Sequence, residues 1–156
     1  MIHFNFELNH NKVNWDPLIR DESIVAQIEG RFEIRLDNDV FFRDDYLCLL
    51  ELGIQLTEWV DAIATDDRPD MNYDAMDHDE PILQFRYRGE DEWRLDSIWQ
   101  QFEAGDVIST SALTMAIKHF LTGLDEALDG HLWSRHPEFL KTVTREGVRC
   151  CWWDVT

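Results

Sequence analysis

The stretch DDYLCLLELGIQLTEWVDAI, residues 44–63, carries the pattern on which the fold prediction depends. Its apolar residues recur at intervals of three and four, which places them on one face of an α-helix. Asp44 or Asp45 can cap the N-terminus and favour the helix dipole, so the sequence predicts a helix from there to about Ile63. Further apolar residues widen this face, and we expect the helix to be central to the fold. The apolar stripe consists of Tyr46, Leu49, Leu50, Leu56, Val60 and Ile63.

Short alternating segments precede this helix. His3–Leu8, Ser23–Glu29 and Phe32–Leu36 alternate apolar and polar side chains, which is typical of strands with one buried face. Asp37–Asp39 is a short polar turn, and Val40–Phe42 follows it as a fourth strand. We expect these strands to be antiparallel neighbours.

A hairpin and a second helix follow. Pro81–Arg88 and Trp93–Trp99 alternate about the Gly-containing loop Gly89–Glu92, which predicts a β-hairpin. The segment Ser111–Leu128 has a helical apolar stripe and a cap at Ser109 or Thr110. These patterns predict a second amphipathic helix.

The order of these elements predicts the fold class. In the tail, Pro137–Val143 fits a short helix and Val148–Val155 a last strand. No linker or internal repeat interrupts the chain, so residues 1–156 are expected to form a single domain. We predict an α+β fold in which two main amphipathic helices pack on an antiparallel sheet.

Composition bounds the class of protein. With 44% apolar residues over 156 positions, the chain can bury a core without disulfides or structural metals. No apolar run is long enough to span a membrane, and the first residues do not resemble a signal peptide. The spacing of Cys48, Cys150 and Cys151 fits neither a disulfide framework nor a metal knuckle, so we expect reduced thiols and a cytoplasmic protein. The sequence favours a monomer and leaves a dimer open.

The charge is strongly acidic. The chain has 32 Asp and Glu against 14 Lys and Arg, a formal net charge of -18. Nucleic acids and anionic membranes attract basic surfaces, so neither is an expected direct ligand. An acidic surface instead favours a basic protein partner, which its field can steer into contact.

The charge is concentrated in one segment. Residues 61–80 contain eight acids and only one base, Arg68, and apolar residues interleave the acids. The structural alternative is a solvated, flexible surface loop with no partner. The interleaving favours a binding surface instead, and we predict that its acids steer the partner and pair with its cations. The predicted partner-binding acids are Asp66, Asp67, Asp70, Asp74, Asp77, Asp79 and Glu80.

Aromatic residues are the candidate anchors of this surface. The chain has seven tryptophans, and neighbouring side chains on a strand alternate faces, so some aromatic surface should remain available for contact. Tyr73 lies within the acidic segment and Trp93 follows the acids of the hairpin loop. We predict both as anchors, whereas Trp59 and Trp99 are expected in the core.

Catalytic and metal motifs are missing from the sequence. No glycine-rich nucleotide motif, GxSxG elbow or HExxH occurs. Asp70, Asn72 and Asp74 match the first ligands of an EF-hand, but Ala75 and Pro81 occupy positions that need Gly and Glu. We therefore predict no enzyme activity, no metal site and no cofactor.

Four segments carry a resemblance to a known family. They are Glu29–Ile34, Leu50–Trp59, Asp79–Phe85 and Trp93–Gln100. Over residues 25–105 the chain is similar to small acidic immunity proteins of bacterial contact-dependent growth inhibition and other polymorphic toxin systems. The resemblance implies a cytoplasmic antitoxin that binds and neutralises a toxin domain, often a nuclease.

Electrostatics agrees with that implication. A nuclease toxin needs a basic phosphate-binding surface, which an acidic protein can cover. Two alternatives use the same acids: a nucleic-acid-mimicking inhibitor of a DNA- or RNA-binding protein, and a metal-dependent hydrolase built on the acidic loop. The first would space its acids over an extended surface, and the second would bind divalent cations.

Overall fold

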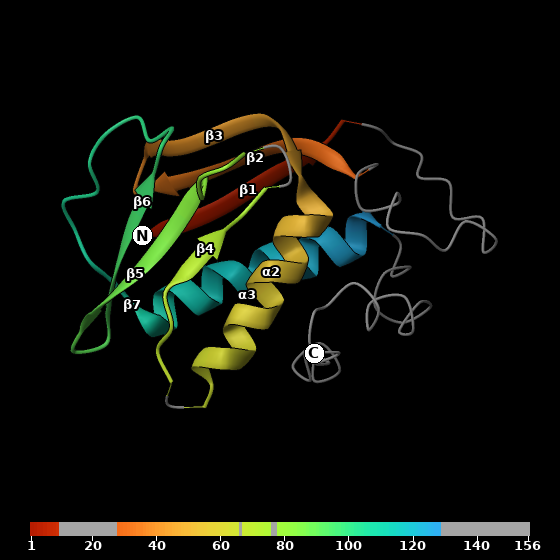
Figure 1. The fold of residues 1–156 in the computed structure, drawn as a ribbon. Coiled ribbons are helices and arrows are strands. Elements are labelled where there is room, and N and C mark those ends of the chain that lie inside the picture. The colour runs from red at the N-terminus through yellow and green to blue at the C-terminus, as the bar shows by residue number, and fades with distance from the viewer. Residues whose placement is uncertain (10–27, 66, 76–77, 129–156) are drawn as a thin grey trace.

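The computed structural model describes residues 1–9, 28–65, 67–75 and 78–128, which contain two antiparallel sheets and two helices (Figure 1). The first sheet has the order β1-β2-β3 and the second the order β4-β5-β6-β7. The α+β class is confirmed, with the strands divided between two sheets rather than forming one. The elements are β1 (Ile2–Leu8), β2 (Glu29–Leu36), β3 (Asp39–Cys48), α2 (Leu49–Ile63), β4 (Met71–Tyr73), β5 (Leu83–Gly89), β6 (Glu92–Ser97), β7 (Ile108–Ser109) and α3 (Thr110–Ala127).

The first sheet follows the predicted alternation. In β1, Ile2 and Phe4 are buried and His3 and Asn5 are exposed, as expected for a strand with one face on the core. β2 pairs with both neighbours in antiparallel register, and the pairing with β3 is shifted near Phe41. Phe41 and Phe42 are therefore both buried, although they are adjacent on a strand.

The boundary between β3 and α2 differs from the prediction. The helix begins at Leu49, and Asp44 and Asp45 lie in β3 instead of capping the helix. The cause is pairing across the sheet: Cys48 lies opposite Glu29, and the N–H of Leu49 donates to the carbonyl of Ile28 at 2.8 Å. This long-range bond satisfies one of the first backbone N–H groups of the helix, which have no acceptor within the helix.

Two further expectations fail with that boundary. Tyr46, predicted in the helix stripe, is 75% exposed on β3. Cys48 is the last residue of β3 rather than part of the helix.

The predicted hairpin is confirmed as β5 and β6. Gly89 pairs with Glu92, and the two residues between them, Glu90 and Asp91, have φ values of 53° and 64°. Positive φ at both central positions is the geometry of the tight turn that matches strand twist. Leu83 and Phe85 face the core, as the alternation predicted.

The acidic segment is not one continuous loop. Met71–Tyr73 forms β4, which pairs with β5 and makes the edge of the second sheet. Met71 and Tyr73 are buried, whereas Asn72 between them is exposed. Met71 and Tyr73, two of the apolar residues that interleave the acids, thus form the inward-facing side of a strand, whereas Met76 lies outside the described residues.

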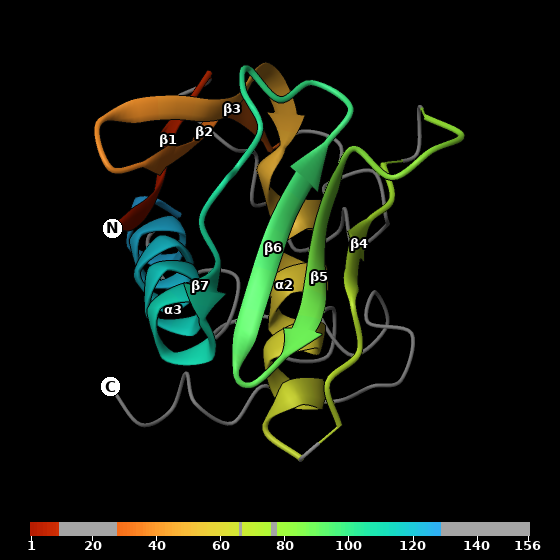
Figure 2. The same ribbon diagram turned by 90° about the vertical axis from the view of Figure 1, so that its left-hand side faces the viewer.

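The two sheets and two helices share one core. Figure 2 shows α2 behind β5 and β6, with α3 alongside. The ring of Phe4 contacts Phe85 of the other sheet at 6.1 Å and Phe120 of α3 at 6.5 Å between centroids. α2 crosses α3 at Gly53, where an added Cβ would lie 3.2 Å from Leu124. The predicted cap of α3 is confirmed, since the Ser109 hydroxyl accepts from the Ala112 N–H at 3.2 Å.

Some predicted elements lie outside the described residues. These are most of the strand 23–29 and the tail elements at 137–143 and 148–155. Among the helices that are described, none is long and apolar enough to cross a membrane.

Candidate functional site

β4 divides the predicted acidic surface into two groups. Asp67 and Asp70 precede the strand, and Asp74, Asp79 and Glu80 follow it. All five are exposed, whereas Asp66 and Asp77 lie outside the described residues. Because a strand advances by about 3.3 Å per residue, the two groups sit at opposite ends of this sheet edge.

The first group meets the tip of the β5–β6 hairpin. The carboxylate of Asp70 accepts a hydrogen bond from the backbone N–H of Tyr87 at 2.8 Å. The tip residues Glu90, Asp91 and Glu92 are all exposed. Their place in the site was missed from the sequence, although the three consecutive acids of the turn were the available signal. We call this group, Asp67, Asp70, Glu90, Asp91 and Glu92, the hairpin end.

The second group is anchored through backbone bonds. The side chain of Gln55 on α2 accepts from the N–H of Asp74 and donates to its carbonyl, both at 3.2 Å. The ring of His78 contacts Trp99 edge-on, with 4.9 Å between centroids. That contact brings the β4–β5 loop, with Asp79 and Glu80, beside the connection between β6 and β7. The carboxylate of Asp74 is left exposed.

The anchor role predicted for Tyr73 and Trp93 is wrong. Tyr73 is 1% exposed and Trp93 is fully buried. The indole of Trp93 packs on Trp59 at 4.9 Å, and its N–H donates to the Thr110 hydroxyl at 2.8 Å. Both rings face inward on their strands and belong to the core. The core prediction for Trp59 is confirmed, whereas Trp99 is only partly buried.

Exposed apolar side chains occur elsewhere, on residues 98–107 between β6 and β7. Ile98 is 50% exposed, Phe102 37% and Val107 48%. The sequence prediction missed them for two reasons. Ile98 falls within the predicted strand Trp93–Trp99, which ends at Ser97 in the structure, and no strand or helix pattern assigns a face to residues 100–107.

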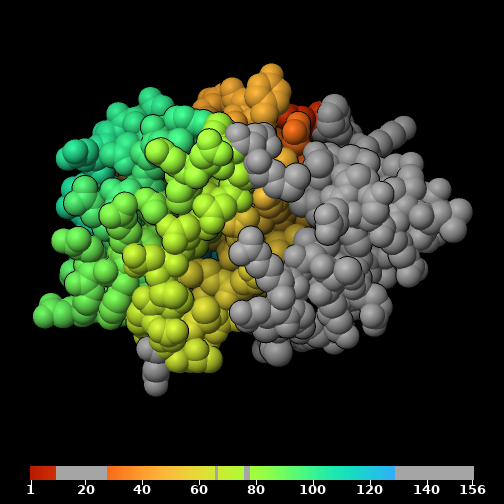
Figure 3. Space-filling model, viewed as in Figure 1, coloured from red at the N-terminus to blue at the C-terminus, as the bar shows by residue number. Residues whose placement is uncertain are grey.

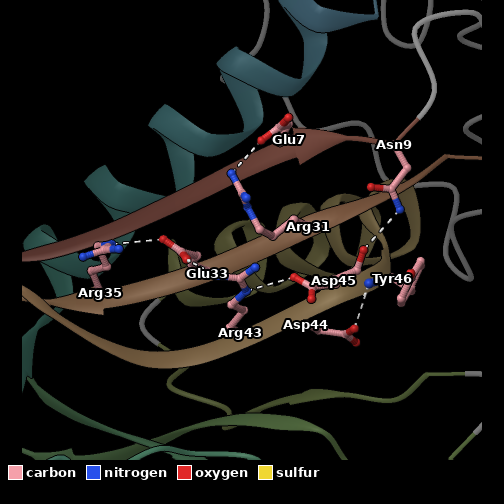
Figure 4. Close-up of polar contacts among 9 residues, drawn as sticks. All are labelled: Glu7, Asn9, Arg31, Glu33, Arg35, Arg43, Asp44, Asp45 and Tyr46. Carbon is pink, nitrogen blue, oxygen red and sulfur yellow. Dashed lines mark hydrogen bonds and ion pairs between the residues drawn. The ribbon is translucent and has the colours of Figure 1, made fainter.

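The two sheets differ in how many of their acids form ion pairs. On the first sheet, Arg31 pairs with Glu7, and Arg35 and Arg43 both pair with the nearly buried Glu33, as Figure 4 shows. Arg43 also pairs with Asp45, which raises the pKa of the arginine further. Arginines of the protein itself thus pair with three acids of this sheet, Glu7, Glu33 and Asp45.

The acids around the ends of the second sheet are not compensated in this way. Within the described ranges, no ion pair involves the hairpin end, nor Asp74, Asp79, Glu80, Glu103 or Asp106. The chain also has no lysine or arginine between Arg68 and Arg86, or between Arg94 and Lys118. These carboxylates remain available for cations supplied by a partner.

The described part of the chain contains no group of three or more His, Cys, Asp or Glu residues that could hold a metal ion. The residues of the partial EF-hand match fall on and beside β4. There the carboxamide oxygen of Asn72 accepts from Gln84 at 2.7 Å, and Asp70 bonds to Tyr87. This extended backbone does not wrap its oxygens around one point as a calcium loop does.

Comparison with known proteins places the chain in a family. No curated protein and no solved structure matches it significantly. One family model matches residues 4–130, which include every described strand and helix except the first two residues of β1. The chain therefore belongs to the family described as a domain of unknown function, DUF7878.

Proposed function

We propose that this protein is an immunity protein, a cytoplasmic antitoxin that binds and neutralises a cognate toxin domain. The toxin is expected to be basic and of the nuclease type. In this proposal the protein has no catalytic activity, and it acts by covering the toxin surface that would bind nucleic acid. A monomer is sufficient for this task.

The observation that carries the proposal is the contrast between the two sheets. Arginines pair with Glu7, Glu33 and Asp45 on the first sheet, so those three charges contribute less to an external field. The exposed acids around the second sheet have no such partners among the described residues. Such a concentration of unpaired negative charge raises the self-repulsion of the fold, which a basic partner would relieve.

A basic toxin would also bind an acidic inhibitor rapidly. Complementary charges can raise association rates to about 10⁸–10⁹ M⁻¹s⁻¹ at low salt. A nuclease must carry a positive surface to hold phosphates, so it is the toxin class that an acidic inhibitor fits best. The same charge disfavours direct binding to nucleic acid or to an anionic membrane.

One observation favours a second candidate function. A nucleic-acid mimic requires acids spaced over an extended surface, and β4 separates Asp67 and Asp70 from Asp74, Asp79 and Glu80. A mimic of this kind would inhibit a DNA- or RNA-binding protein of the host or of a phage. Both candidates predict a basic protein partner, so the identity of the partner discriminates between them.

The test begins with capture of partners by the tagged full-length protein from its native host, at about 50 mM and about 500 mM salt. Proteins retained only at low salt are identified by mass spectrometry. The proposal expects a basic toxin domain whose nuclease activity is abolished at one molar equivalent of this protein, with growth protected on co-expression. Capture of a host DNA-binding protein instead would support the mimic, and loss of growth protection would refute the antitoxin role.

A further inference from the structure

One segment of the described surface combines exposed apolar side chains with unpaired acids. It is centred on the connection between β6 and β7, where Ile98 and Phe102 are 50% and 37% exposed. Trp99 lies between them in sequence, and Glu103 follows. The neighbouring β4–β5 loop adds Asp79 and Glu80 through the His78–Trp99 contact. We call this set, Ile98, Trp99, Phe102, Glu103, Asp79 and Glu80, the connection surface.

The backbone of the connection surface is held in place from both sides. The Ser97 hydroxyl donates to the carbonyl of Ile82 at 2.6 Å and accepts from the N–H of Trp99 at 3.0 Å. The Gln100 side chain accepts from the N–H of Ser97 at 3.0 Å, which closes the turn. The N–H of Gln101 donates to the carbonyl of Phe41 at 2.8 Å and ties the connection to β3.

Aromatic packing fixes the side chains as well. Phe102 contacts Phe41 edge-on at 5.7 Å, and Trp99 stacks near Phe42 at 6.4 Å between centroids. Figure 3 shows the teal atoms of the connection beside the yellow-green atoms of the β4–β5 loop. A surface ordered before binding loses little conformational entropy when a partner docks.

We infer that the connection surface is where the basic toxin domain docks, with Ile98 and Phe102 entering an apolar site that arginines and lysines surround. This inference rests on the proposed function and names the surface that performs it. Apolar contacts at the centre with charged groups at the rim are the usual anatomy of a protein interface. The neighbouring charge selects the occupant, because the two segments that form the surface carry acids and no lysine or arginine.

The hairpin end is the natural comparison. It carries five acids against three on the connection surface, but none of the exposed large apolar residues of the described chain lies on it. It can add to the field that attracts a basic partner, but it lacks apolar anchors to slow dissociation. We therefore expect the same change in charge to have different effects on binding rates at the hairpin end and at the connection surface.

The test uses the full-length protein and the toxin domain captured above, with binding rates measured by surface plasmon resonance. Ile98→Ser is expected to speed dissociation about tenfold or more, as loss of an interface hot spot does. Met115→Ser is the matched control, since Met115 is 71% exposed on α3. It should leave the rates unchanged. Thermal unfolding of each variant should stay close to that of the parent protein, because Ile98 is half exposed and Met115 is 71% exposed.

Two double variants that reverse charge compare the connection surface with the hairpin end by their effects on the association rate. Asp79→Lys with Glu103→Lys should slow association at low salt about tenfold and also weaken growth protection. Asp67→Lys with Glu92→Lys changes the net charge equally at the hairpin end, and it should slow association by no more than about threefold.

The outcomes for the docking surface and for the antitoxin role can be told apart. Protection by the parent protein together with unchanged binding by Ile98→Ser would refute this docking surface and leave the antitoxin role intact. Absence of binding or protection by the parent protein would overturn both. A dimer of this chain in sedimentation velocity that Ile98→Ser dissociates would assign the connection surface to a second copy instead.

Discussion

The carboxylate of Asp70 accepts a hydrogen bond from the backbone N–H of Tyr87, with 2.8 Å between oxygen and nitrogen. The two residues are far apart in sequence, and the bond joins the residue just before β4 to the end of β5. The register that pairs Met71 with Phe85 brings them together. An acid predicted from its charge alone thus also has a structural role in holding the edge strand.

Replacing Asp70 tests that role. Asp70→Ala removes the acceptor and should lower the free energy of unfolding by about 1 kcal/mol, the usual worth of one hydrogen bond. Asp70→Asn retains a carbonyl oxygen and should recover most of this loss. The measurement is urea unfolding monitored by circular dichroism. Asp79→Ala is the control, because Asp79 is exposed and should change stability by less than about 0.5 kcal/mol. An equal loss of stability in the Ala and Asn variants would show that the charge of Asp70, not the hydrogen bond, matters.

Gly30 should tolerate no side chain. An added Cβ would collide with the backbone carbonyl of Glu7 and lie 2.7 Å from Leu49. Since β1 and β2 pair at this point, relief requires movement of the sheet, and Gly30→Ala should cost at least about 2 kcal/mol. At Gly105 an added Cβ meets nothing within 4 Å, so Gly105→Ala should be nearly neutral. Thermal denaturation of the two variants makes the comparison, and equal midpoints would contradict it.

Trp93 should affect stability. Trp93→Phe removes the indole N–H that bonds to Thr110 and part of the packing on Trp59, so it should lower the free energy of unfolding by about 1–3 kcal/mol. Tyr46→Phe is the matched aromatic control, since Tyr46 is exposed on β3. That change should cost less than about 0.5 kcal/mol. Chemical denaturation measures both, and a neutral Trp93→Phe would argue against the core position.

Asp125 predicts a pH dependence of stability. Burial, with a smaller contribution from the charge of Glu126, raises the pKa of Asp125 above its ordinary value. A folded-state pKa above the unfolded value means that the ionised carboxyl destabilises the fold at neutral pH. The penalty shrinks as the pH falls through the raised pKa and is gone below the ordinary value of 3.8.

Asp125→Asn should therefore raise the free energy of unfolding at pH 7, and this gain should fade as the pH is lowered toward 4. Urea unfolding at several pH values measures the difference. Asp106→Asn provides the control for the exchange itself, because Asp106 is exposed and the change there should alter the free energy of unfolding by less than about 0.5 kcal/mol. A difference between Asp125→Asn and the parent protein that does not change with pH would exclude titration of Asp125 as its cause.

The candidate site shows the limit of reasoning from charge. The sequence indicated that residues 61–80 are acidic and that a basic partner is favoured, and the described acids of this segment from Asp67 onward are indeed exposed. Which acids lie together depends on β4. This strand has only three residues, and it is defined by its pairing with β5 rather than by a local sequence pattern. Tyr73 and Trp93 neighbour acids in the chain, which favours them as anchors from sequence alone, yet neighbouring residues on a strand face opposite sides.

The sequence by itself determined the elements whose signals are local. The hairpin of β5 and β6 has its alternation and its turn within a few residues, and α3 has its cap at Ser109 next to its apolar stripe. Tertiary structure alone decided the start of α2 at Leu49, the existence of β4 and the burial of Trp93. Each of these depends on a partner distant in the chain: Ile28 for Leu49, Phe85 for Met71 and Thr110 for Trp93. Local patterns express the preferences of neighbouring residues, whereas these partners become available only when the sheets and helices assemble around one core.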